Sequence, residues 1–148
     1  EQFSETMRQA AIPFLDPAVY GRSTLENSSF LVSSMNPEEA LHGRGYVARL
    51  SGSTAEFMSI WQIMMFGRKP FLRTESGVQI NLQPCIPAYL IDEERTIRAA
   101  FLENSTVIYH FAECRDYFPG SYSIRIQSVV DVDAIRQGAA TEIVVDVS

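Results

Sequence analysis

A glycine-rich segment followed by small hydroxyl residues is the part of this chain best suited to chemistry. The sequence reads Gly-Arg-Gly at 43–45 and Ser-Gly-Ser-Thr at 51–54, directly before a run of apolar residues. Where a helix begins, unpaired backbone N–H groups and the positive end of the helix dipole favour an anion. Ser51, Gly52 and Ser53 are therefore candidate phosphate ligands, and Arg44 is a candidate binding residue close by. The alternative is that these residues only cap the helix.

Other residues with chemical potential are scattered. Glu26 lies in a polar segment beside an asparagine and two serines, and is a candidate substrate-binding residue. His42 could be a ligand or an acid–base group, or an ordinary histidine of a surface loop. The carboxylate runs at 38–39 and 92–94 are typical of solvated turns. The two histidines and two cysteines show no spacing typical of a metal site.

The candidate phosphate residues precede the strongest helix signal in the chain. Ser53 and Glu56 match a capping box, and residues 57–66 are apolar almost all round. A helix of this kind must be buried on most sides, and Gly67 is a suitable stop. Upstream, the spacing of apolar residues predicts a helix over 3–11, a short helix over 25–32 and one turn over 37–42.

The pattern changes to strands after Lys69 and Pro70. Apolar residues alternate over 78–82, and residues 96–102 and 106–111 flank a turn, as in a hairpin. Residues 122–126 and 141–147 supply further strands. The sequence therefore predicts an α+β protein in which an antiparallel sheet or sandwich packs against the buried helix.

Composition limits the function classes. The chain has 148 residues, is 46% hydrophobic and carries a net charge of −6, which suits one domain and argues against nucleic-acid binding. No apolar run reaches the length of a membrane span, so we expect no membrane partner and a cytoplasmic location. Cys85 and Cys114 are expected to be buried free thiols. The chain begins without methionine, and we expect a fragment of a longer protein.

Taken together, the motifs resemble glycoside hydrolase family 94, the cellobiose and chitobiose phosphorylases. That family carries a Gly-Arg-Gly loop, a Thr-Gly-Ser/Thr-Ala segment before a buried helix ending in glycine, and a Gly-Leu-x-Ile-x-Pro-Cys-Ile-Pro strand. The matching residues here, in the same order and at nearly the same spacing, are 43–45, 51–53, Gly67, 77–80 and 84–87. The resemblance covers roughly residues 20–111.

The resemblance implies an architecture and a reaction. Residues 1–67 would be the last helices and loops of an (α/α)₆ barrel, and residues 68–148 a C-terminal antiparallel β-sandwich. The parent enzyme would cleave a β-linked disaccharide or oligosaccharide with inorganic phosphate, using an upstream aspartate as general acid and no cofactor. Ser51 and Gly52 match the family's phosphate-binding pair. This chain alone would be inactive, and a homodimer is possible.

Two alternatives remain. Where the family has tryptophan, this chain has Glu56, which could serve as a base in a hydrolase that uses water instead of phosphate. The chain could instead be a non-catalytic β-sandwich module that binds glycan or stabilises a larger enzyme. An exposed row of aromatic rings, using Tyr109, Tyr117 and Tyr122, would favour that module, whereas buried rings would count against it.

Overall fold

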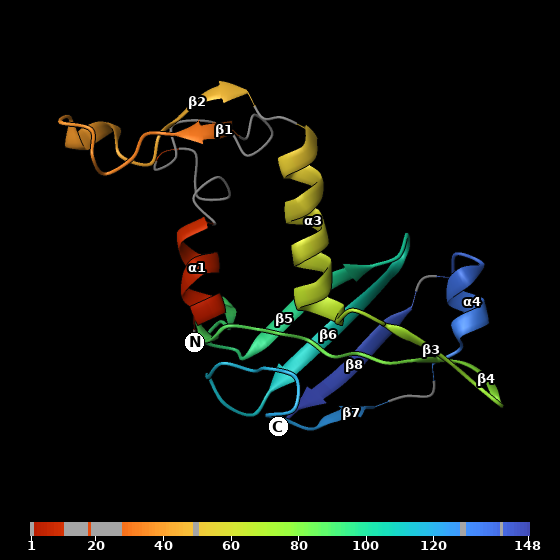
Figure 1. Ribbon diagram of the computed structural model, residues 1–148. Helices are drawn as coiled ribbons and strands as arrows, with labels where there is room; N and C mark the ends of the chain where they lie inside the picture. The colour runs from red at the N-terminus through yellow and green to blue at the C-terminus, as the bar shows by residue number, and fades with distance from the viewer. Residues whose placement is uncertain (1, 11–17, 19–27, 49–50, 128–129, 140) are drawn as a thin grey trace. The chain divides into compact units, whose positions relative to one another are not determined.

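The computed structural model describes residues 2–10, 18, 28–48, 51–127, 130–139 and 141–148, and for residues 10, 28–31, 45–48 and 51–54 it describes the backbone alone. The described chain mixes helices with mostly antiparallel strands, which confirms the predicted α+β class. It divides into two compact units, residues 1–59 and 60–148, and the division falls inside the helix α3 (Ser51–Phe66). Figure 1 labels the elements.

The first unit contains α1 (Gln2–Ala10) and a small antiparallel pair, β1 (Ser28–Leu31) and β2 (Gly45–Ala48). α1 confirms the predicted first helix. The predicted helix over 25–32 is wrong in its described part, because residues 28–31 form β1 and pair with β2. The turn predicted over 37–42 is present as the short 3-10 helix η3 (Glu39–Leu41).

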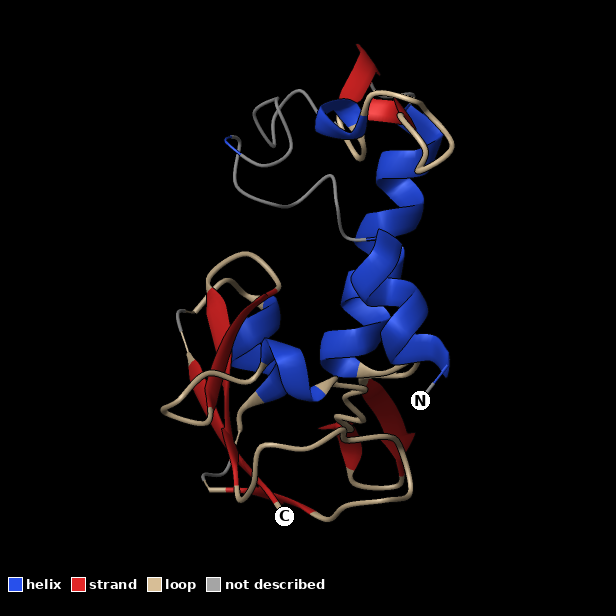
Figure 2. Ribbon diagram, turned by 90° about the vertical axis from the view of Figure 1, so that its left-hand side faces the viewer, coloured by secondary structure: helices blue, strands red, loops and turns tan. Residues whose placement is uncertain are grey.

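The second unit is built on a four-stranded sheet in the order β5-β6-β8-β7. Its strands are β5 (Thr96–Phe101), β6 (Ser105–Phe111), β7 (Ile124–Ile126) and β8 (Glu142–Val147). β5 and β6 form the predicted hairpin, closed where Phe101 lies opposite Ser105. A separate hairpin joins β3 (Phe71–Thr74) to β4 (Gly77–Ile80). The strands of the larger sheet are visibly twisted in two views (Figures 1 and 2).

The prediction of a wholly antiparallel sheet is wrong at one pair of strands. β6 and β8 run parallel, from Thr106 opposite Glu142 to Phe111 opposite Val147. β7 then pairs with β8 in the antiparallel sense. Parallel neighbours need a long crossover connection, and the chain between β6 and β8 contains both β7 and the short helix α4 (Val132–Arg136).

The core of the second unit lies on one face of the larger sheet. Alternate residues of its strands point to this face and are buried together with the end of α3 and the segment that follows β4. Ring pairs tie these layers together: Phe66 lies 4.8 Å from Phe101, and Phe111 lies 5.0 Å from Tyr117, between ring centroids. The core members are Met65, Phe66, Leu82, Ile86, Ile91, Ala99, Phe101, Val107, Tyr109, Phe111, Tyr117, Ile135, Ile143, Val145 and Val147.

Hydrogen bonds join the C-terminal end of α3 to the rest of the second unit, residues 60–148, which is called the sheet unit below. The last four carbonyl groups of a helix have no partner within it. Here each accepts a hydrogen bond: Ile63 from Gly67 N–H at 2.8 Å, Met64 from Cys85 N–H at 2.7 Å, Phe66 from Gln83 N–H at 3.2 Å, and Met65 from the Tyr109 hydroxyl. Gly67 adopts φ +85°, as expected of a glycine that ends a helix. The predicted stop is confirmed.

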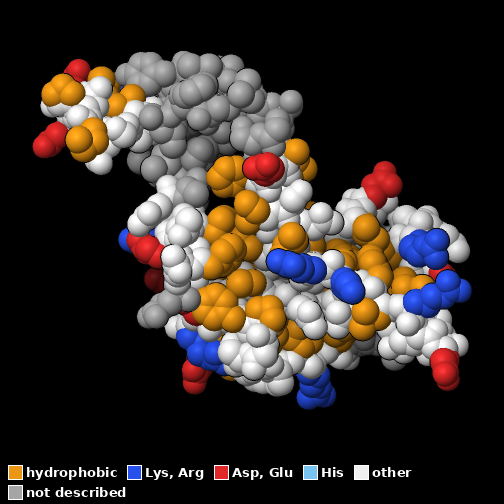
Figure 3. Space-filling model, in the orientation of Figure 1, with side chains coloured by type: hydrophobic (Ala, Val, Ile, Leu, Met, Phe, Trp, Pro, Cys, Tyr) orange, Lys and Arg blue, Asp and Glu red, His pale blue; other side chains and the backbone are white. Residues whose placement is uncertain are grey.

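Two other predictions about α3 are wrong. The helix begins at Ser51, so Ser53 lies inside its first turn, and the capping box of Ser53 and Glu56 does not mark its start. The helix is also not buried on most sides. Its last turn is buried, but Met58, Trp61 and Ile63 are exposed by 68%, 49% and 43%. Figure 3 shows hydrophobic side chains open to solvent along this helix.

Helix α4 has a local cause that the sequence prediction did not use. The Asp131 carboxylate accepts hydrogen bonds from the backbone N–H groups of Asp133 and Ala134, each at 3.0 Å, which is an N-cap. Val132 and Ile135 then bury the same side of the short helix. Among the described helices, none is long and apolar enough to cross a membrane.

Candidate functional site

The three predicted phosphate residues form the first turn of α3. Ser51, Gly52 and Ser53 open a helix of 16 residues, and no acidic residue lies in its first turn. The first backbone N–H groups of such a helix have no partner within it and lie at the positive end of its dipole. Glu56 follows one turn later and is exposed. The structure places the predicted phosphate residues at a helix N-terminus, and their role in binding phosphate stays a prediction.

The other two predicted site residues do not join this turn in the described contacts. Arg44 is exposed at the end of the loop between β1 and β2, where its N–H donates to Leu41 O at 3.0 Å and its carbonyl accepts from Val32 N–H at 3.0 Å. Its guanidinium has no partner among the described residues. Glu26 lies outside the described residues, so its predicted role in substrate binding stays a prediction.

His42 has a structural partner. The loop between β1 and β2 closes on itself because Gly43 N–H donates to Val32 O at 2.8 Å. His42 Nε2 lies 2.8 Å from the carbonyl oxygen of Asn36 across the same loop. This contact accounts for the histidine as part of a folded surface loop and gives no sign of a ligand or an acid–base group.

The three tyrosines considered for an aromatic row do not form one. Tyr109 and Tyr117 are completely buried, with 0% of each exposed. Tyr122 is half-buried, and its hydroxyl donates to Pro84 O at 2.6 Å. Burial raises the pKa of the Tyr109 hydroxyl and that of the Tyr122 hydroxyl. Since two of the three rings lie in the core, this geometry counts against a glycan-binding row.

A shallow groove lies beside Tyr122 instead. It runs between residues 81–83 and 119–124 and encloses about 200 Å³. Its lining residues include Asn81, Gln83 and Tyr122, and none of the lining residues is charged. The groove therefore offers hydrogen-bond donors and acceptors next to an apolar surface.

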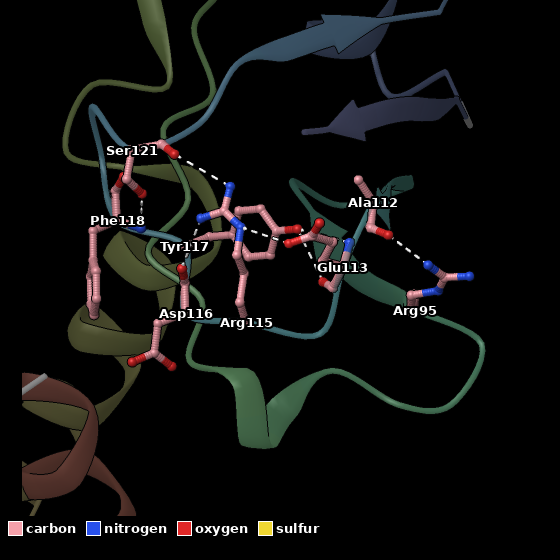
Figure 4. Close-up of polar contacts among 8 residues, drawn as sticks. All are labelled: Arg95, Ala112, Glu113, Arg115, Asp116, Tyr117, Phe118 and Ser121. Carbon is pink, nitrogen blue, oxygen red and sulfur yellow. Dashed lines mark hydrogen bonds and ion pairs between the residues drawn. The ribbon is translucent and has the colours of Figure 1, made fainter.

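One wall of this groove belongs to a loop that is held rigidly. The Arg115 guanidinium lies over the Tyr117 ring, 4.2 Å from its centroid, and pairs with Glu113 at 3.6 Å. The same guanidinium donates to Ser121 O at 3.4 Å, and the Ser121 hydroxyl donates to Phe118 O at 2.8 Å. Figure 4 shows these contacts converging on the loop before β7. The wall is therefore stabilised by contacts within its own loop.

The sequence prediction missed the groove residues. Asn81 and Gln83 alternate with the apolar Ile80 and Leu82, and only the apolar half of that alternation served to predict a strand. The polar half was a usable signal, because two carboxamides two residues apart share one side of an extended segment. Gly120 gave no such signal, because it lines the groove only together with residues 81–83, which lie far away in sequence.

The cysteines and acidic residues form no further site in the described part of the chain. Cys85 and Cys114 are free thiols, as predicted, although Cys114 is exposed and Cys85 only partly buried. Burial raises the pKa of the Cys85 thiol, which makes it a poorer nucleophile. The described residues contain no group of three histidine, cysteine or acidic side chains placed to hold a metal ion.

Comparison with known proteins gives no match: no protein family, no curated protein and no solved structure aligns with this chain at a significant level.

Proposed function

We propose that this chain is the C-terminal part of an inverting glycoside phosphorylase of the family 94 type. In this proposal the first turn of α3 contributes part of the site for inorganic phosphate, through the backbone of Ser51, Gly52 and Ser53. The observation that carries the proposal is structural. Two motifs of the resemblance, the helix that ends at Gly67 and the segment 84–87, are in direct contact.

The contact between the two motifs is close. Cys85 N–H donates to Met64 O, and a Cβ on Gly67 would lie 2.9 Å from that of Gln83. Pro84, Ile86 and Pro87 are all buried beside the helix end. Residues that form the motifs of a protein family are expected to contact one another in its fold. Their spacing in this sequence therefore has a physical reason, which supports the resemblance.

The proposed chemistry assigns phosphate a double role. Phosphate attacks the anomeric carbon from the face opposite the leaving group and thereby replaces the water of an inverting hydrolase. An anion can act as nucleophile without a base, so the only proton to be supplied is the one on the leaving oxygen, from a general acid in the helical barrel. The first turn of α3 would hold phosphate through backbone N–H groups, which donate hydrogen bonds to the phosphate oxygens. The positive end of the helix dipole would also attract the negative charge of phosphate.

Exposed apolar residues on more than one side of α3 support a larger helical parent. Met58, Trp61 and Ile63 leave between 43% and 68% of their surface open to water, which is unusual for residues of this size within 16 residues of one helix. Neighbouring helices of a barrel would cover them. The sheet unit would then complete the C-terminal β-sandwich. Two free thiols also agree with a reducing compartment, in line with a cytoplasmic enzyme.

The phosphate site can be tested on the chain itself. Titration of the isotope-labelled chain with inorganic phosphate is expected to shift the backbone amide resonances of Ser51, Gly52 and Ser53. Gly52→Asp should abolish these shifts, because a carboxylate in the first turn repels phosphate and occupies the same N–H groups. The substitution should not unfold the helix, since an acidic residue near a helix N-terminus is favourable by about 0.3–1 kcal/mol.

Ser59→Asp provides the matched control. It adds the same charge to α3 about two turns further along, at an exposed position. Phosphate binding by the Ser59→Asp variant should stay within about twofold of the unsubstituted chain, because a surface charge at this distance is largely screened at physiological salt. Equal loss of phosphate binding in both variants, or phosphate shifts that do not involve residues 51–53, would contradict the site.

A further inference from the structure

The groove on the sheet unit has a lining that points to a ligand, and this inference goes beyond the proposed function. We propose that the groove between residues 81–83 and 119–124 binds one neutral sugar ring. Its volume of about 200 Å³ lies below the roughly 300–1,000 Å³ of sites for drug-sized ligands. It therefore suits a single small ring and not a longer chain inserted end to end.

The lining selects against charged ligands. None of its residues is acidic, basic or histidine; they are Asn81, Leu82, Gln83, Pro119, Gly120, Tyr122 and Ile124. A charged ligand would lose part of its hydration without gaining a counter-ion, which is costly. Neutral ligands carry no such penalty. The chemistry of the groove thus favours a neutral molecule with hydrogen-bonding groups of its own.

The carboxamides favour hydroxyl groups as those partners. The Gln83 side chain has no partner among the described residues, so its oxygen and its nitrogen are both available. Asn81 donates from Nδ2 to Lys69 O at 2.9 Å, which fixes its orientation and leaves Oδ1 free to accept. A primary carboxamide presents one acceptor and two donors side by side. Adjacent hydroxyls of a sugar, each both donor and acceptor, match that arrangement.

The apolar part of the groove suits the carbon face of a sugar ring. The Tyr122 ring is held by two contacts: its hydroxyl donates to Pro84 O, and its edge meets the Tyr117 ring, with 6.0 Å between centroids. Pro119 and Ile124 flank it in the lining. A ring fixed before binding loses little conformational freedom when a ligand packs against it. Apolar C–H groups and hydroxyls can therefore be accommodated together.

Gly120 is the glycine of the groove lining. It adopts φ +93°, a conformation that glycine accepts readily, and a Cβ built on it would meet no atom within 4 Å. The open space beside this residue leaves the loop backbone accessible to a ligand. The loop itself is held from behind by the bond from Arg115 to Ser121 O.

Titration of the isotope-labelled 148-residue chain with methyl β-D-glucopyranoside tests the proposal. The expected result is saturable shifts of the amide resonances of Leu82, Gly120, Tyr122 and Ile124, with a dissociation constant in the millimolar range typical of a small polar ligand. Gln83→Ala should raise this constant about tenfold, since it removes hydrogen bonds to the sugar. It retains the Cβ that lies against Gly67.

Gln79→Ala is the control, because Gln79 is an exposed glutamine of β4 outside the groove. It should leave the dissociation constant unchanged. Absence of saturable shifts, shifts confined to other residues, or equal effects of Gln79→Ala and Gln83→Ala would overturn the proposal. Inorganic phosphate should leave the groove resonances unmoved, so failure of the sugar site and failure of the phosphate site at residues 51–53 give different results.

Discussion

Replacing Gly67 by alanine is expected to lower the free energy of unfolding of the sheet unit by about 3 kcal/mol. Two costs add. The backbone at Gly67 has φ +85°, which costs an L-residue roughly 1–2 kcal/mol. A Cβ there would also lie 2.9 Å from Gln83 Cβ and 3.0 Å from Gln83 O, and overpacking of this kind costs roughly 1–3 kcal/mol. Urea denaturation followed by the fluorescence of the single tryptophan, Trp61, measures the change.

Gly138→Ala separates the two costs. Gly138 has the same φ of +85°, but a Cβ there would lie 3.6 Å from Asn104 Nδ2, which is ordinary contact. The free energy of unfolding of this variant should fall only by the cost of backbone strain, roughly 1–2 kcal/mol. Equal losses in the two variants would mean that the helix end does not approach the segment after β4 as closely as described. The proposed function would then lose its structural support, which is the contact between the end of α3 and the segment after β4.

The second large effect is a loss of stability at alkaline pH that depends on Tyr109. Burial raises the pKa of its hydroxyl above the ordinary value of about 10, so the fold favours the neutral phenol. The contribution of the neutral Tyr109 hydroxyl to the free energy of unfolding is fully present below pH 10, where the unfolded chain also keeps the proton. It is lost as the pH rises above 10, by about 1.4 kcal/mol per pH unit. Denaturation measured between pH 8 and roughly pH 11.5 reports this slope.

Tyr109→Phe should remove the contribution of Tyr109 to the alkaline slope and leave that of Tyr122, whose hydroxyl pKa is also raised by burial. The variant should be less stable at neutral pH by about 1–3 kcal/mol, because Met65 O loses its donor inside the core. Tyr122→Phe should reduce the slope less, since Tyr122 is only half-buried and its charge is better screened. An alkaline slope that is the same in Tyr109→Phe as in the unsubstituted chain would contradict the buried position of this hydroxyl.

Elements whose partners are close in sequence could be predicted. The hairpin of β5 and β6 was predicted, because its alternation and its turn lie within 16 residues of chain, from Thr96 to Phe111. The end of α3 was predicted for the same reason, since glycine at 67 is a local signal. β1 was not, because Phe30 and Leu31 fit a short helix by spacing, and their strand partners lie on β2, beyond a folded loop.

The parallel pairing of β6 with β8 is a second case of long-range control. Strands of the type found at 141–147 were predicted, but nothing in Ile143 or Val145 specifies whether the neighbour runs parallel. The direction depends on how β7 and α4 route the chain between them. For the same reason the burial of α3 was overpredicted: an apolar helix requires apolar partners, and the sequence does not specify which residues supply them.

The candidate sites divide in the same way. The first turn of α3 was predicted as an anion site because its signal is contiguous, from Ser51 to Ser53. The groove was missed because it joins residues 81–83 to residues 119–124 through the packing of Tyr122 against Pro84. A site made by one segment can be proposed from the sequence alone, whereas a groove between two segments becomes visible only in the fold.

The proposed function is tested most directly by a phosphorolysis assay of the longer enzyme that the proposal implies. That enzyme is incubated with a panel of β-linked disaccharides, with and without inorganic phosphate, and sugar 1-phosphate is measured. We expect release of an α-configured sugar 1-phosphate only when phosphate is present, because inversion at a β-linkage gives the α-product. Release of free sugar without phosphate would indicate a hydrolase, and no turnover of any disaccharide would leave a non-catalytic module; either result would contradict the proposal.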